Sequence, residues 1–129
     1  MSVRTLLRRV PIGLLVLSLS GCIDPCENEV RTELVSPDRT KRAVVFERSC
    51  GATTPFSTHV SVLDRAEALP HTAGNIFDAD GNHGTINEVK VTVQWLSPKE
   101  LVLRYPARAR VFSKMTEVHG VAIVYQATP

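Results

Sequence analysis

The sequence lacks any apolar run that is long enough to cross a membrane as a helix. Its most apolar stretch, Val10–Leu19, covers only ten residues, whereas a helix needs roughly 20 residues to span the hydrocarbon core of a bilayer. A permanent transmembrane helix is therefore disfavoured.

Motifs that carry chemistry are absent as well. The sequence has no Cys-x-x-Cys pair, no glycine-rich phosphate loop and no repeat of propeller-blade length. No nucleophile elbow surrounds Ser49, Thr53 or Ser57. The four histidines are scattered singly, at His59, His71, His83 and His119. The sequence thus predicts no cofactor and points to no particular reaction.

What the N-terminal region does contain is the pattern of an export signal. Arg4, Arg8 and Arg9 precede or border the apolar stretch, and residues 1–21 carry no acidic side chain. A short basic segment followed by an apolar segment of this length is typical of a cleavable secretory signal. We therefore predict that residues 1–21 are removed.

The signal ends in Leu19-Ser20-Gly21-Cys22, which resembles the lipobox of bacterial lipoproteins. The resemblance implies that Cys22 receives a diacylglyceryl group through its sulfur and becomes the first residue of a lipoprotein. Two or more acyl chains, such as palmitate, give stable anchoring in a membrane. By the same resemblance, Ile23 favours the outer membrane of the cell envelope, with the domain facing the periplasm. The alternative is an ordinary signal peptide followed by a structural cysteine.

Removal of the signal would reverse the sign of the net charge. The whole chain has 15 basic and 13 acidic residues, and three of the arginines lie in residues 1–21. The mature chain, 22–129, would therefore carry 12 basic and 13 acidic side chains, a net charge of −1. Because nucleic-acid-binding domains are strongly basic, nucleic acid is not expected as a partner. The mature length suits a single domain.

Two cysteines remain once Cys22 is lipidated. Export implies an oxidising compartment, in which Cys26 and Cys50 are expected to form a disulfide bond. A metal pair or a reactive thiol are the alternatives, and no zinc-type spacing supports them. Residues 23–25 alone separate Cys22 from Cys26, and four residues reach at most about 14 Å. The domain is therefore predicted to lie directly on the membrane surface.

Alternating apolar and polar residues predict an all-β fold. Apolar side chains occupy every second position in Val91–Trp95, Leu101–Tyr105 and Val121–Tyr125, as in strands with one buried face. Further strands are expected at Val30–Val35, Arg42–Arg48, Thr58–Leu63 and Arg108–Ser113. Short connections favour about seven mostly antiparallel strands in a meander, forming a sandwich or a small barrel.

One long segment, 65–88, has weak periodicity and is predicted to be a loop. Long loops in compact domains are functional or mobile, so a site is expected here first. Asp78, Asp80 and Asn82 supply closely spaced oxygens, as a calcium loop does, but the glycine and glutamate of an EF-hand are each one position out. An Asx-rich surface turn is the alternative interpretation.

Three arginines form a candidate anion-binding site. Arg104, Arg108 and Arg110 lie close together in the sequence around Pro106. If this segment turns a hairpin, two guanidinium groups would lie side by side and attract an anion such as a lipid headgroup. A solvated basic face is the alternative.

Three short motifs of the mature chain are Ser36-Pro37-Asp38, Ala43-Val44-Val45-Phe46 and Cys50-Gly51-Ala52-Thr53-Thr54. With them the chain resembles a family of small uncharacterised bacterial exported proteins, and a weaker likeness continues to Arg110-Val111-Phe112. Arg39 stands where the turn of that family has glycine. The resemblance implies no activity, so no functional residue is taken from it.

Two hypotheses from different functional classes remain. The first is a non-enzymatic, membrane-anchored binding or interaction module of the bacterial envelope, with an envelope protein as its partner. The second is a small envelope hydrolase that uses Asp78, Asp80 or His83 in the segment 65–88. A concave pocket that gathers these groups would favour the hydrolase. The lack of a catalytic motif favours the module.

Overall fold

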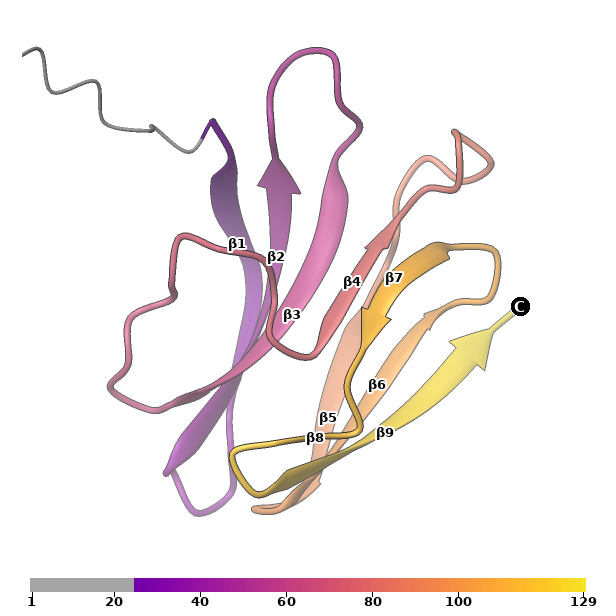
Figure 1. Cartoon of the computed structure of the whole chain (residues 1–129). Coiled ribbons are helices and arrows are strands. Elements are labelled where there is room, and N and C mark those ends of the chain that lie inside the picture. Colours follow the sequence, from indigo (N-terminus) through magenta and orange to yellow (C-terminus); the bar gives the residue numbers. More distant parts are fainter. Residues whose placement is uncertain (1–24) are drawn as a thin grey trace, which may run out of the picture.

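Nine strands and no helix make up residues 25–129, the part of the chain that the computed structural model describes. The predicted signal, residues 1–21, and the predicted lipidation site, Cys22, lie outside the described residues. The strands form two sheets that are not closed into a barrel (Figure 1). The all-β fold is confirmed, and of the two predicted architectures the chain adopts the sandwich.

The first sheet has five antiparallel strands. Their order across the sheet is β1 (Glu27–Val35), β2 (Lys41–Ser49), β3 (Ser57–Asp64), β4 (Phe77–Asp80) and β7 (Arg110–Lys114). The first four follow one another along the chain and form the predicted meander. β7 joins them only after the chain has built a hairpin of the other sheet.

The second sheet has four strands. Their order is β5 (Thr92–Ser97), β6 (Glu100–Pro106), β9 (Val121–Thr128) and β8 (Glu117–Val118). β6 and β9 run parallel, because the chain crosses to the first sheet as β7 before it returns. The meander therefore ends at β4 and does not describe the second sheet.

All seven predicted strands are present, with ends that differ by three residues or fewer. The two additional strands are the short β4 and β8. β4 interrupts the segment 65–88 that was predicted as one long loop. Its position matters for the site, because it places two acidic residues between β3 and the edge strand β7 of the first sheet.

The main apolar core lies between the two sheets. Val60 and Val62 of β3 belong to the same buried cluster as Leu101 and Leu103 of β6. In each strand these side chains are two positions apart, so they point to the same face. The period-two pattern in the sequence is thus the pattern of residues that face the opposite sheet.

A smaller apolar cluster covers the outer face of the first sheet. The run Ala43–Phe46 in β2 is buried on both faces, and its outward side chains pack with Leu63 and Leu69. Leu69 belongs to the β3–β4 connection, which Figure 1 shows as the long loop beside β3. The Asn75 side chain fixes this connection, because its Oδ1 and Nδ2 each lie 2.8 Å from the backbone of Val62.

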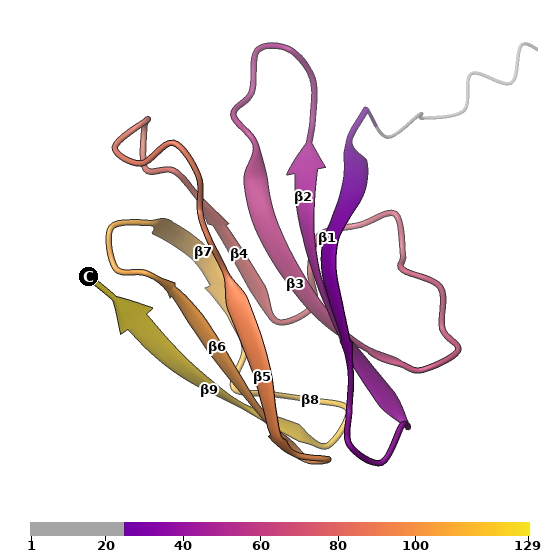
Figure 2. The same ribbon diagram turned by 180° about the vertical axis from the view of Figure 1, so that it is seen from behind.

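Hydrogen bonds join the two sheets at both sides of the sandwich. At one side, Nε1 of Trp95 in β5 donates to the carbonyl of Leu34 in β1 at 3.0 Å; Figure 2 shows these two strands facing the viewer. At the other side, the Tyr125 hydroxyl lies 2.8 Å from the carbonyl oxygen of Ile76 and 2.6 Å from that of Met115. Burial raises the pKa of Tyr125 to about 12, so this hydroxyl stays protonated.

Candidate functional site

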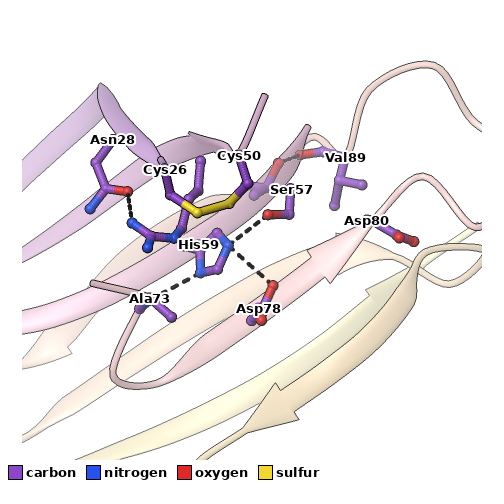
Figure 3. Close-up of polar contacts among 12 residues, drawn as sticks. Cys26, Asn28, Cys50, Ser57, His59, Ala73, Asp78, Asp80 and Val89 are labelled. Atoms are coloured by element: carbon purple, nitrogen blue, oxygen red, sulfur yellow. Dashed lines mark hydrogen bonds and ion pairs between the residues drawn. A yellow bond between two sulfur atoms is a disulfide. The ribbon is translucent and has the colours of Figure 1, made fainter. Parts of the chain in front are cut away.

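Polar side chains line up across the outer face of the first sheet. Opposite positions on β1, β2, β3, β4 and β7 are held in turn by Asn28, Arg48, Ser57, Asp80 and Arg110. We call these five residues the polar row. Cys26 and Cys50 form a disulfide bond at the same end of the sheet, with an S–S distance of 2.05 Å (Figure 3). The predicted cysteine pairing is therefore confirmed.

His59 lies on the same face of the sheet, two positions from Ser57 along β3 and further from the disulfide end. It is almost fully buried. His59 is 3% exposed, and its ring stacks on the ring of Phe46 with 5.4 Å between the two ring centroids. Its Nδ1 accepts a hydrogen bond from the Gly74 N–H at 3.0 Å. Its Nε2 lies 2.7 Å from Ser57 Oγ and 3.2 Å from Asp78 Oδ1 (Figure 3).

These contacts determine the protonation state of His59. Because Nδ1 accepts the Gly74 N–H, the neutral ring carries its proton on Nε2. Burial, together with the positive charge of Arg48, lowers the pKa of His59 to about 4. Burial also raises the pKa of Asp78, and the nearby charge of Asp80 raises it further. At neutral pH the ring is therefore uncharged.

The His59 cluster is not arranged for nucleophilic catalysis. In a catalytic triad one ring nitrogen faces the serine and the other faces the carboxylate. Here Nε2 faces both Ser57 and Asp78, while Nδ1 is occupied by the backbone of Gly74. Since Nε2 carries the proton, it cannot accept one from Ser57. The geometry indicates that His59 holds the β3–β4 connection against the sheet through its hydrogen bond with Gly74.

This arrangement predicts acid sensitivity. The pKa of His59 is about 4 in the folded state, below its ordinary value of 6.5, so the unfolded chain takes up the proton first and stability falls as the pH drops from 6.5 towards 4. The raised pKa of Asp78 acts in the opposite direction. We expect a net loss on the order of 2 kcal/mol between pH 7 and pH 4.5, measured by urea unfolding at both pH values.

A matched pair of variants assigns this loss to one histidine. His71→Gln removes an exposed histidine and should keep the full pH dependence. His59→Gln should be less stable at pH 7 and should lose most of the further decrease at pH 4.5. An unchanged pH dependence in His59→Gln would show that another group titrates.

Asp80 and Arg110 form an ion pair at the β7 end of the polar row. Asp80 is 4% exposed; its Oδ1 accepts a hydrogen bond from Arg110 Nε at 3.1 Å, and its Oδ2 accepts another from Nη2. Arg110 Nη1 also donates to Nε2 of His83 at 2.8 Å. The hydrogen bonds from Arg110 hold the pKa of Asp80 below its usual range. The carboxylate is therefore ionised and already paired.

The oxygens of the candidate calcium cluster do not converge. Asp78 contacts His59, whereas Asp80 pairs with Arg110 and also accepts the Asn82 N–H at 2.9 Å. This last contact is an Asx turn, which matches the alternative interpretation of the sequence. No group of three or more His, Cys, Asp or Glu residues within 25–129 is arranged to hold a metal ion.

The three arginines of the candidate anion site are separated. Arg104 lies on β6 of the second sheet, where it donates to Gln94 Oε1 at 3.2 Å. Arg108 lies in the turn before β7, and its carbonyl accepts a hydrogen bond from Asn82. Arg110 belongs to the first sheet and pairs with Asp80. Arg104 and Arg110 line different hollows, so the structure does not gather the three around one anion.

Two open hollows flank the Asp80–Arg110 pair. One has a volume of about 390 Å³ and contains His83; the other has a volume of about 370 Å³ and contains His59 and Asp78. The pair borders both. The three residues of the hydrolase hypothesis are thus divided between two hollows, with a guanidinium group in contact with Asp80 and His83. The structure therefore does not gather all three residues in one hollow.

The sequence prediction placed a site in the segment 65–88 and missed what β2 and β3 add to it. Arg48, Ser57 and His59 come from these two strands. Alternation along β3 does place Ser57 and His59 on the face opposite Val60 and Val62, so their shared orientation could have been predicted. Their partners in β4 could not, because the sequence does not specify the register between the strands.

The chain matches no protein-family model, and comparison with curated proteins and with solved structures finds no match. In the described part of the chain, no helix has the length and apolar character needed to cross a membrane.

Proposed function

We propose that the protein is a lipid-anchored, non-enzymatic interaction module of the bacterial cell envelope. The export pattern of residues 1–21 and the lipobox-like Leu19-Ser20-Gly21-Cys22 support export and lipidation. Ile23 supports the outer membrane, with the domain facing the periplasm. An envelope protein is the proposed partner, and the paired charges around Asp80 support binding rather than catalysis.

The observation that carries this proposal is the position of the disulfide relative to Cys22. Cys26 is bonded to Cys50, and β1 begins at Glu27, so the folded domain starts at once after the lipobox-like segment. The four residue-to-residue steps from Cys22 to Cys26 span at most about 14 Å. A lipid on Cys22 would therefore hold the sandwich against the membrane, where it meets membrane-bound partners and does not range across the periplasm.

The anchor is tested by the intact mass of the full-length protein expressed in a bacterium with two membranes. We expect a product that begins at Cys22, carries acyl chains and fractionates with the outer membrane. Cys22→Ser should abolish acylation and leave residues 1–21 attached. Ser20→Ala, which keeps a small residue before the cysteine, is the matched control and should be processed normally. A wild-type product without lipid, or one that retains the signal, contradicts the proposal.

The binding role is tested by crosslinking in intact cells followed by mass spectrometry. Wild-type protein should crosslink to a defined envelope protein, and Asp80→Asn should weaken that link if the polar row contributes to the contact. An unrelated outer-membrane lipoprotein at the same abundance gives the background. A set of neighbours identical to that background would contradict a specific interaction module.

A further inference from the structure

The β2–β3 connection after Cys50, residues 51–56, exposes a large apolar side chain at the disulfide end of the sandwich. Phe56 is 62% exposed, more than any other large apolar side chain in residues 25–129, and it belongs to neither apolar cluster. Single exposed apolar side chains are common on protein surfaces. What distinguishes Phe56 is its position in the fold.

The connection lies next to the point where the lipid anchor would attach. It follows Cys50 directly, and the Cα atoms of Cys50 and Cys26 are 3.9 Å apart. Figure 1 shows the start of β1 and the tip of the β2–β3 connection at the same end of the molecule. With Cys22 at most about 14 Å from Cys26, this end is the one that a lipid on Cys22 brings to the bilayer.

The connection is also suited chemically to the membrane interface. All six of its residues are exposed, and none is charged, so the connection itself brings no ionised group into the bilayer. A turn gives the connection a defined shape, since the Thr54 N–H and the Thr54 hydroxyl both donate to the carbonyl of Gly51, at 3.3 and 3.2 Å. Aromatic side chains insert favourably at the boundary between headgroups and acyl chains.

We propose that residues 51–56 form a second membrane contact, with the Phe56 ring inserted into the bilayer interface and the sandwich held upright on its disulfide end. This inference rests on the proposed lipidation of Cys22. The anchor makes the second contact intramolecular, so a single ring is enough to bias the orientation even though it would not bind a membrane alone. The far end of the sandwich, with the β5–β6 turn, then faces away from the membrane.

Tryptophan fluorescence tests this orientation. Phe56→Trp is compared with Leu96→Trp, because Leu96 is similarly exposed, at 54%, and lies next to the β5–β6 turn at the far end (Figure 1). Both full-length lipidated variants are reconstituted into vesicles of phosphatidylethanolamine and phosphatidylglycerol, with or without bromine on the acyl chains. The wild-type signal of Trp95 is the baseline. We expect a blue-shifted emission for Phe56→Trp that loses more than half its intensity in brominated vesicles, and no such change for Leu96→Trp.

The other outcomes overturn the inference, and they separate it from the proposed function. Vesicle flotation shows whether the protein is anchored. If both variants float but neither is quenched, the anchor stands and the second contact is refuted. Equal quenching of both would mean that the domain has no fixed orientation. A blue shift without quenching would mean that another protein or a second copy covers position 56. A product that carries no lipid and does not float refutes the anchor and the contact together.

Discussion

Phe77→Ala is expected to lower the free energy of unfolding by about 3–5 kcal/mol. Phe77 is fully buried, and its ring centroid lies 5.3 Å from that of Tyr105 and 6.2 Å from that of Tyr125. The residue thus joins the short strand β4 to the second sheet. Its removal leaves a cavity that the two rigid sheets cannot close. A loss of this size is a large fraction of the 5–15 kcal/mol that is typical of a domain.

The loss is measured as the shift in the urea midpoint of the full-length protein, with unfolding followed by Trp95 fluorescence. Phe112→Ala is the matched control, because Phe112 is 56% exposed and its ring lies against the guanidinium of Arg110, 4.9 Å from the ring centroid. We expect it to cost less than about 1 kcal/mol. Equal losses for the two variants would mean that β4 does not pack against the second sheet.

The sequence predicted the long strands because their side chains alternate between the core and solvent. Val91–Trp95 and Leu101–Tyr105 show this pattern over enough residues to be read without knowledge of their neighbours. β4 shows it too, since Phe77 and Ala79 are buried in the core, but it has only four residues and two of them are aspartates. In such a short segment the acidic residues favour the prediction of a loop. Its strand conformation depends on pairing with β3 and β7.

The candidate site was less predictable than the fold for a related reason. The disulfide could be predicted because the proposed lipidation of Cys22 and the expected oxidising compartment leave one pairing of the three cysteines. The contact between His59 and Asp78 depends instead on strand register, and a shift of a single residue would turn one of them to the other face. The ion pair of Asp80 and Arg110 requires in addition that β7 joins the first sheet after the β5–β6 hairpin. No local pattern encodes that crossover.

Removing the Cys26–Cys50 disulfide is expected to lower the free energy of unfolding by about 3 kcal/mol. The bond joins residues 24 positions apart, so it restricts the unfolded chain, and it ties the residue just before the edge strand β1 to the residue just after β2. For a domain of this size the loss corresponds to a decrease in melting temperature on the order of 15 °C. Calorimetry of the Cys26→Ala/Cys50→Ala double variant measures it.

The reduced wild-type protein provides the control for this prediction, because it should melt at the same temperature as the double variant. Addition of a reductant should not change the melting temperature of the double variant. Hydrogen exchange locates the effect: amides at the start of β1 should exchange faster, while those of β6, in the other sheet, should change only with global stability. A wild-type protein whose thiols titrate as reduced but whose melting temperature is unchanged would refute the prediction.

Because the proposed lipid attaches four residues before Cys26, a frayed β1 would also lengthen the tether. The same reduction should therefore release Phe56 from the bilayer while leaving the protein anchored.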